Sequence, residues 1–400
     1  MKTMSATVRA CLLAFLTLFA VSGGLATTYT PNTFTDPAIT TVNNATGAIN
    51  GGTTISLRSA IQAAEATGGT HTITLSAGTY QVTLGTIRMG DVTNENLTFN
   101  GPVATPPTAI INMAGTTAAS LGGTKDRIFF INTTATTAGV QATFNYVKFT
   151  NGALSSDGYG GGAMRAGGPT NVLNLNNCVF DSNTLDVANG GGTTGGAINI
   201  SGGGAVTVSG CTFTNNTNPD ADGGALYCFY PNNGGTTGSL TVTNCTFSNN
   251  GATRSSGGSG SGGAIGIATQ GHIVASTFTA SIQRNTFTNN TATGDGGAII
   301  VNNGDAGYSI DVSYNRFVGN SSSNAATSAF GQRHGEQQLV GSQQRTRCDG
   351  GAAGGECAGG RDGHADRGSL AATENDHGTH LHSRQWIHDC HGEFPEQFQR

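Results

Sequence analysis

The side chains that could carry out chemistry are few, and the most notable are three aspartates in glycine-rich surroundings. Asp220 and Asp222 lie two residues apart, and Asp222 and Asp295 each directly precede a Gly-Gly-Ala sequence. Two or three facing carboxylates would suit a glycoside hydrolase. Clustered carboxylates for calcium, with a nearby Arg or Lys as base, would suit a polysaccharide lyase. Asp220, Asp222 and Asp295 are therefore the candidate catalytic residues, and Asp220 with Asp222 the candidate calcium ligands.

Two short sequence phrases recur through the middle of the chain and would position these residues. One is Gly-Gly-Ala followed by Ile or Leu, and the other centres on a phenylalanine that is mostly followed, three residues later, by asparagine. The phenylalanines are Phe149, Phe180, Phe213, Phe247, Phe287 and Phe317. Their separations of 31, 33, 34, 40 and 30 residues are typical of solenoids, propellers and helical arrays.

The repeated unit consists of short β-strands. Residues 205–209 and 239–244 alternate apolar and polar side chains, are rich in β-branched residues and end in Asn or Gly turns, which excludes helical repeats. Two or three short strands per period, separated by long Gly/Asn/Ser loops, fit one coil of a parallel β-helix better than a propeller blade. We therefore predict an all-β fold, a parallel β-helix (a solenoid) over residues 72–331.

Alternation along each strand predicts what lies inside. Cys178, Cys211 and Cys245 share a strand face with their phenylalanines, so we expect an aromatic row beside a row of buried, unpaired thiols. Asn285 and Asn315 occupy the cysteine site in later coils. The asparagines three residues after the phenylalanines are expected to adopt the left-handed turn conformation and to bond their amides to the next coil.

The same spacing argues against an active site. An ungapped count places Asp222 and Asp295 two coils apart, which is about 10 Å at the spacing of hydrogen-bonded strands. Lys148 and Arg316, each just before a phenylalanine, should point outward at opposite ends of the array. We therefore expect the aspartates to form turns and the cations to keep the surface soluble, with an enzyme as the alternative.

The two phrases together resemble a known family. Gly-Gly-Ala-Ile paired with Phe-x-x-Asn, between Phe149 and Asn320, is similar to the repeat of the polymorphic outer-membrane proteins of chlamydiae and of many environmental bacterial surface proteins. This resemblance implies a single-stranded right-handed parallel β-helix of the pectin-lyase-like type, exported and often adhesive, without implying a reaction. Ser-Leu-Arg-x-Ala-Ile at residues 56–61 also resembles the CSLREA-type segment of exported β-helix proteins, although Ile55 replaces its first cysteine.

The N-terminal part contains two further signals. Lys2 and Arg9 precede an apolar run at residues 11–21 and small residues at 24–26, which predicts a signal peptide over residues 1–26. Residues 27–71 would be a lead-in and a short capping helix with Ser56 as N-cap, covering the open end of the core. We expect a secreted or outer-membrane surface protein with no transmembrane helix after signal cleavage.

Residues 332–400 differ abruptly from the rest. They hold 17 charged residues in 69, against 24 in the preceding 331, and seven of the nine histidines. Read one nucleotide later, codons for residues 337–347 can encode Asn-Asn-Trp-Trp-Gly-Ala-Asn-Asn-Gly-Pro-Gly, a phrase typical of bacterial β-helix proteins. We interpret this segment as a frameshifted, disordered tail, so the zinc-like spacing of His377, His380 and His382 carries no functional inference.

Composition completes the sequence-based hypothesis. Charged residues are only 10% of the chain and the formal net charge is −5, so there is no basic face for nucleic acid. We predict a structural or adhesive role, in which a polar ladder surface binds a polysaccharide or a cell-surface protein and calcium is the one cofactor considered. The alternatives are a polysaccharide lyase or glycoside hydrolase, and a nonfunctional remnant of a frameshifted gene.

Overall fold

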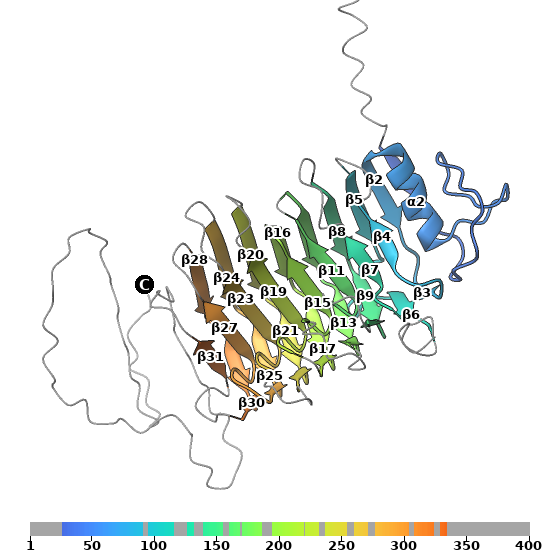
Figure 1. Ribbon diagram of the computed structural model, residues 1–400. Helices are drawn as coiled ribbons and strands as arrows, with labels where there is room; N and C mark the ends of the chain where they lie inside the picture. Colours follow the sequence, from blue (N-terminus) through green and yellow to red (C-terminus); the bar gives the residue numbers. More distant parts are fainter. Residues whose placement is uncertain are drawn as a thin grey trace, which may run out of the picture. The chain divides into compact units, whose positions relative to one another are not determined.

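The computed structural model shows a protein built almost entirely of parallel β-strands (Figure 1). It describes residues 26–90, 95–115, 126–131, 139–154, 160–168, 170–185, 194–219, 221–231, 237–253, 260–270, 277–303, 308–323 and 329–333. Within these ranges the named elements are one helix, α2, and strands β1 to β31. The strands form four sheets in which every pairing of named strands is parallel. The predicted all-β class is confirmed.

Sheets one and two are each built from strands one period apart in the sequence. Sheet one contains, in spatial order, β1 (Thr27–Tyr29), β2 (Gly69–Thr74), β5 (Glu95–Asn100), β8 (Gln141–Asn145), β12 (Val172–Asn176), β16 (Gly204–Ser209), β20 (Thr237–Thr243), β24 (Thr277–Gln283) and β28 (Tyr308–Ser313). Sheet two contains β3 (Gly78–Val82), β6 (Ala109–Met113), β9 (Val147–Thr150), β13 (Val179–Asp181), β17 (Thr212–Thr214), β21 (Thr246–Ser248), β25 (Thr286–Thr288) and β29 (Arg316–Val318).

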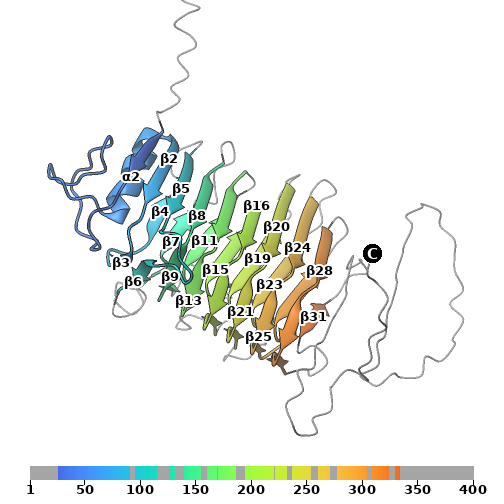
Figure 2. The same cartoon turned by 180° about the vertical axis from the view of Figure 1, so that it is seen from behind.

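Sheets three and four have the same progression. Sheet three contains β10 (Ala153–Leu154), β14 (Thr184–Leu185), β18 (Thr217–Asn218), β22 (Gly251–Ala252), β26 (Thr291–Ala292) and β30 (Ser321–Ser322). Sheet four contains β4 (Ile87–Met89), β7 (Phe129–Ile131), β11 (Met164–Gly167), β15 (Ile198–Ser201), β19 (Leu226–Pro231), β23 (Ile265–Gln270), β27 (Ile299–Asn303) and β31 (Phe330–Arg333). From β8 onward the chain therefore visits the four sheets in one fixed order. Figures 1 and 2 show the successive strands of sheets one and four side by side.

The recurring phenylalanines lie in register, and their rings stack. Phe180 pairs with Phe213, and Phe213 with Phe247. The centroids of these successive rings are 4.8 and 4.6 Å apart with interplanar angles of 6° and 5°. All three side chains are fully buried. The predicted internal aromatic row is confirmed, and it follows from placing one residue type at the same point of a parallel ladder.

The predicted sulfur row is also present. Cys178, Cys211 and Cys245 are buried free thiols. The backbone N–H of Cys178 donates to Sγ of Cys211, and that of Cys211 to Sγ of Cys245, each at 3.3 Å. Burial raises the pKa of the Cys211 thiol. In the next repeat Oδ1 of Asn285 accepts the Cys245 N–H at 2.8 Å, so sulfur and amide oxygen fill the same role along one ladder.

The asparagine ladder corrects one expectation. Asn216 is buried, and its amide donates to Oδ1 of Asn250 at 3.0 Å, as expected of a bond to the next repeat. The left-handed conformation, however, belongs to the preceding exposed residue, with φ of 55° at Asn215 and at Asn249. The prediction was wrong by one position because the turn must be made outside, where a left-handed asparagine is tolerated, while the next side chain points inward.

The N-terminal elements are joined to the sheets by side-chain contacts. Helix α2 (Leu57–Thr67) begins at the Ser56 N-cap, whose hydroxyl accepts from the N–H of Ser59, and it contacts β2 and β4. Its buried face, which includes Ile61, belongs to the hydrophobic core. The lead-in before the helix also contains a strand, since β1 pairs with β2 at the edge of sheet one.

Three sequence-based predictions concern segments at the chain's two ends. The signal peptide lies almost wholly outside the described residues, since only residue 26 of it is described. The charged tail from residue 334 onward is likewise outside them, and β31 extends to Arg333, two residues past the predicted end of the β region. Within the described part of the chain, α2 is too short to cross a bilayer and no other helix could do so.

Candidate functional site

The two described candidate aspartates lie at equivalent turns of sheet four. The N–H of Gly223, next to Asp222, donates to the carbonyl of Ser261, and the N–H of Gly262 donates to the carbonyl of Asp295, both at 2.9 Å. Asp222, Ser261 and Asp295 therefore occupy the same place in three successive repeats. The structure thus places the two aspartates two repeats apart, as counted from the sequence, and does not bring them side by side.

The carboxylate of Asp222 stabilises this turn. Its Oδ1 accepts the backbone N–H of Ser261 at 2.8 Å, and its Oδ2 accepts from Nδ2 of Asn302 at 3.2 Å. Burial and the nearby Asp222 carboxylate raise the pKa of the Tyr227 hydroxyl. Because one of its carboxylate oxygens accepts a hydrogen bond from the backbone of the next repeat, Asp222 has the contacts expected of a turn-forming residue.

The calcium hypothesis is not tested by these contacts. Asp220 lies outside the described residues, so the Asp220–Asp222 pair has no described geometry. Among the residues that are described, no three His, Cys, Asp or Glu side chains are grouped so as to hold a metal ion. Asp220 and Asp222 therefore stay a prediction as calcium ligands.

The two candidate cations stand in one outward row of sheet two, near its opposite ends. Lys148 is on β9 and Arg316 on β29. Nζ of Lys148 lies 2.8 Å from Oδ2 of Asp181 on the neighbouring strand β13. Burial alone would raise the pKa of Asp181, but the hydrogen bond and charge of Lys148 lower it. Lys148 is therefore an ion-pair partner of Asp181.

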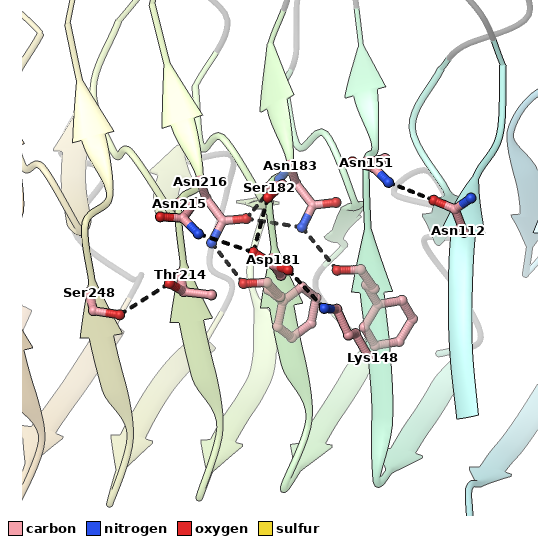
Figure 3. A network of polar contacts seen from close by, with 12 residues as sticks. Asn112, Lys148, Asn151, Asp181, Ser182, Asn183, Thr214, Asn215, Asn216 and Ser248 are labelled. Carbon is pink, nitrogen blue, oxygen red and sulfur yellow. Dashed lines mark hydrogen bonds and ion pairs between the residues drawn. The ribbon is translucent and has the colours of Figure 1, made fainter. Parts of the chain in front are cut away.

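Asp181 is a residue that the sequence analysis did not select. It accepts hydrogen bonds at Oδ1 from the Ser182 hydroxyl at 3.0 Å and from Nδ2 of Asn215 at 3.4 Å, in addition to the Lys148 contact (Figure 3). The available signal was alignment of the repeats: Lys148 precedes its phenylalanine and Asp181 follows the next one, so the two charges are diagonal neighbours in a parallel ladder.

The surroundings of Asp181 form a largely polar surface, which we name the polar face. It consists of the outward residues of sheet two and of the turn that follows. The first row is Lys148, Val179, Thr212, Thr246, Thr286 and Arg316, the second is Thr150, Asp181, Thr214, Ser248, Thr288 and Val318, and the turn row is Asn151, Ser182, Asn215, Asn249, Asn289 and Gly319. These side chains are half-buried or exposed.

Hydrogen bonds along the rows hold this surface in place. The Ser248 hydroxyl donates to Oγ1 of Thr214 at 3.2 Å, and Nδ2 of Asn151 donates to Oδ1 of Asn112 at 2.8 Å (Figure 3). In a parallel sheet like positions recur every ~4.8 Å, so the hydroxyls and amides form regular columns of donors and acceptors. Such an array can bind an extended polar polymer through many weak, equivalent hydrogen bonds.

No protein-family model, curated protein or solved structure matches this chain.

Proposed function

We propose that the chain forms a right-handed parallel β-helix displayed outside the cell, with a structural and adhesive role in which the polar face binds a polysaccharide. The fixed order in which the chain visits four parallel sheets supports the β-helix. The apolar run after Lys2 and Arg9 supports export. The resemblance of the repeat to the polymorphic outer-membrane proteins supports an outer-surface location and adhesion.

One observation carries the binding proposal, namely the register of the hydroxyl rows. Thr212, Thr246 and Thr286 are direct partners on adjacent strands, and none of them is buried. A polysaccharide is itself a repeating polymer of hydroxyls, so a row of like groups on rigid strands can meet it along several residues with little loss of side-chain entropy on binding. A globular protein partner would not need such regularity.

The enzyme alternative receives less support from the same contacts. Both oxygens of the Asp222 carboxylate accept hydrogen bonds from the protein, and Lys148 is ion-paired with Asp181. A lyase needs a cation able to act as base near the bound sugar, and a hydrolase needs facing carboxylates. Asp222 and Asp295 lie two repeats apart, which is about 10 Å at the strand spacing and slightly more than the ~6.5–9.5 Å of an inverting hydrolase, and Asp222 is held at the turn.

Affinity electrophoresis of the full chain through gels containing neutral polysaccharides tests the proposal. Replacing Thr212, Thr246 and Thr286 together by Ala should weaken retention about tenfold, because three equivalent hydrogen-bonding groups are lost. The matched control replaces Thr207, Thr241 and Ser281 by Ala, since these are in-register outward residues of the same three repeats on sheet one.

Two results would overturn the proposal. Equal retention of the two triple variants, or no retention of the wild type by any polysaccharide, would remove the polar face as a glycan site. Appearance of unsaturated sugar products with calcium present, abolished by Asp222→Ala, would establish the lyase instead.

A further inference from the structure

The outward residues of six successive strands of sheet one, β5, β8, β12, β16, β20 and β24, form three rows in register. The first row is Asn96, Gln141, Val172, Ala205, Ser239 and Thr279, the second is Thr98, Thr143, Asn174, Thr207, Thr241 and Ser281, and the third is Asn100, Asn145, Asn176, Ser209, Thr243 and Gln283. None of these residues is buried, and none is charged. We name the three rows the neutral face. Figures 1 and 2 show five of its strands, β5, β8, β16, β20 and β24, side by side.

The absence of charge distinguishes the neutral face from the polar face. The rows of the polar face include Lys148, Asp181 and Arg316, whereas the rows of the neutral face include no ionisable side chain. An ionised side chain binds a shell of water strongly and orients that water around itself. Water above the neutral face is therefore ordered by hydroxyl and amide groups, with Val172 and Ala205 as the apolar members of the rows.

Hydrogen bonds between neighbouring strands hold the side chains of the neutral face in place. Nδ2 of Asn145 donates to Oδ1 of Asn100 at 2.8 Å, and Nδ2 of Asn176 donates to Oδ1 of Asn145 at 2.9 Å. In the second row, Nδ2 of Asn174 donates to Oγ1 of Thr143 at 3.2 Å. Threonine is also stiff about χ1 because its Cβ is branched. These polar groups are therefore largely fixed before a ligand arrives, which lowers the entropy lost on binding.

The neutral face is regular in two directions. Like positions recur every ~4.8 Å from strand to strand, and same-face residues recur every ~6.7 Å along each strand. The rings of Phe180, Phe213 and Phe247 rotate by only 6° and 5° between the same repeats, whereas adjacent strands of ordinary sheets rotate by about 20–25°. The repeats therefore stack with little twist, and the face they build is close to a flat lattice of hydroxyl and amide groups.

We propose that the neutral face binds the surface of ice. Its two spacings are close to repeats of the oxygen atoms in the hexagonal ice lattice. Each fixed hydroxyl or amide can hold a water molecule by a hydrogen bond nearly as favourable as a direct contact. Water molecules held at these spacings match a growing ice layer, and the contact is strong because many weak bonds form at once over a rigid surface.

Other partners use this surface less fully. A single polysaccharide chain is ordered in one direction and would follow one row, which leaves the second direction of the lattice without a role. A protein partner would be expected to meet a more apolar centre, since the buried core of protein interfaces is depleted of polar area. The neutral face is on a different sheet from the polar face, so this proposal does not depend on the polar face binding a polysaccharide.

Slow freezing of a solution of the full chain tests the proposal, because growing ice rejects solutes that do not bind to it. The wild type should be enriched in the ice, and it should hold a single crystal from growing just below its melting point. Thr241→Tyr places a bulky ring at the middle of the neutral face, so enrichment should fall at least about tenfold through loss of flat contact. Thr291→Tyr is the matched control, since Thr291 is an exposed threonine on β26 of sheet three.

A second variant guards against a folding defect at the half-buried Thr241. Thr279→Tyr changes an exposed position of the same face and should also lower enrichment, and circular dichroism checks that each variant is folded. Exclusion of the wild type from ice would overturn the proposal, and so would equal enrichment of folded Thr241→Tyr, Thr279→Tyr and Thr291→Tyr.

Two further results would assign the neutral face to another partner and overturn the proposal. One is retention of the wild type by crystalline cellulose together with its exclusion from ice. The other is a dimer in sedimentation that Thr241→Tyr dissociates, again with exclusion from ice. Ice enrichment and gel retention are separate measurements, so the failure of this proposal and the failure of polysaccharide binding at the polar face are distinguishable.

Discussion

The repeats from Phe180 to Phe317 and the N-terminal part from Thr27 to Phe130 are built from the same parallel sheets in two different ways. In the repeats, the phenylalanine position uses the same residue at successive levels, and successive rings are 5–11° from parallel. In the N-terminal part the rings are mostly tilted, as with the 57° between Phe99 and Phe129. There, an ion pair between Asp36 and Arg58 links the lead-in to α2.

This difference means that the two parts of the chain are stabilised by different kinds of contact and present different surfaces. Identical side chains in a parallel ladder stack on or hydrogen-bond to one another, so each repeat can be stabilised by its neighbours alone. The N-terminal part lacks this self-matching and depends on individual contacts between segments distant in sequence. The regular part therefore offers an extended, uniform surface, while the irregular part does not.

The largest expected effect is a break in the aromatic row. Phe213→Ala should lower the free energy of unfolding by about 3–5 kcal/mol, because a fully buried ring between two stacked neighbours leaves a cavity. Phe130→Ala, on the outer side of sheet four, should cost less than half as much. Urea unfolding followed by circular dichroism measures both, and similar losses would contradict the contrast between the inner aromatic row and the outer side of sheet four.

The next effect concerns the buried amide ladder. Asn216→Ala removes the donor to the Phe180 carbonyl and the acceptor of the Asn183 N–H, at 2.9 and 3.1 Å. We expect a loss of about 1–3 kcal/mol, since water can enter the vacated space and bind part of the orphaned backbone. Asn215→Ala, one residue earlier and exposed, is the control for the turn, and a larger loss there would mean that the turn matters more than the ladder.

In the N-terminal part the Asp36–Arg58 contact should make stability depend on pH. Burial alone would raise the pKa of Asp36, but Arg58 and the N–H groups of Leu84 and Thr83 lower it overall. The pKa of Asp36 is therefore lower in the folded state than in the unfolded state, where it is about 3.9. The ion pair's contribution to stability is present above the unfolded-state pKa and is lost as the pH falls through the folded-state pKa. Asp36→Asn should therefore cost about 1–3 kcal/mol at pH 7 and much less at pH 2 to 3.

Unfolding curves of wild type and Asp36→Asn at the two pH values give the measurement. Asp181→Asn provides a comparison on the polar face, where the Lys148 pair is more exposed and should contribute less than ~1 kcal/mol. If the cost of Asp36→Asn does not change with pH, the ionised carboxylate is not what joins the lead-in to α2.

The smallest expected effect is an exchange within the cysteine row. Cys245→Asn should change the free energy of unfolding by less than ~1 kcal/mol, because Asn285 in the next repeat already forms the equivalent bonds, to the Cys245 N–H and to the Val242 carbonyl. Cys245→Val removes the acceptor and adds volume at a packed site, so it should be the more destabilising of the two. The reverse order would show that sulfur packing, and not hydrogen bonding, selects the residue at this position.

Many features of the fold could be predicted from the sequence because they are local. Alternation along a strand places Phe213 and Cys211 inside, and the predicted N-cap at Ser56 begins the helix. The one-residue error at Asn216 arose where two asparagines are adjacent, since either could take the left-handed conformation and only packing decides which amide turns inward. The position of Asp222 relative to Asp295 also followed from counting repeats.

What the sequence by itself determined, then, is the period, the inward residues and the all-β class, since these follow from side-chain alternation and repeated spacing. The tertiary structure alone decided which groups meet at other places: Asp222 meets Asn302, and both Arg88 and Arg165 meet Phe130. These partners come from strands about 30 to 80 residues apart along a chain whose repeats vary in length. Their meeting therefore depends on inter-strand register and loop path, which no local pattern specifies.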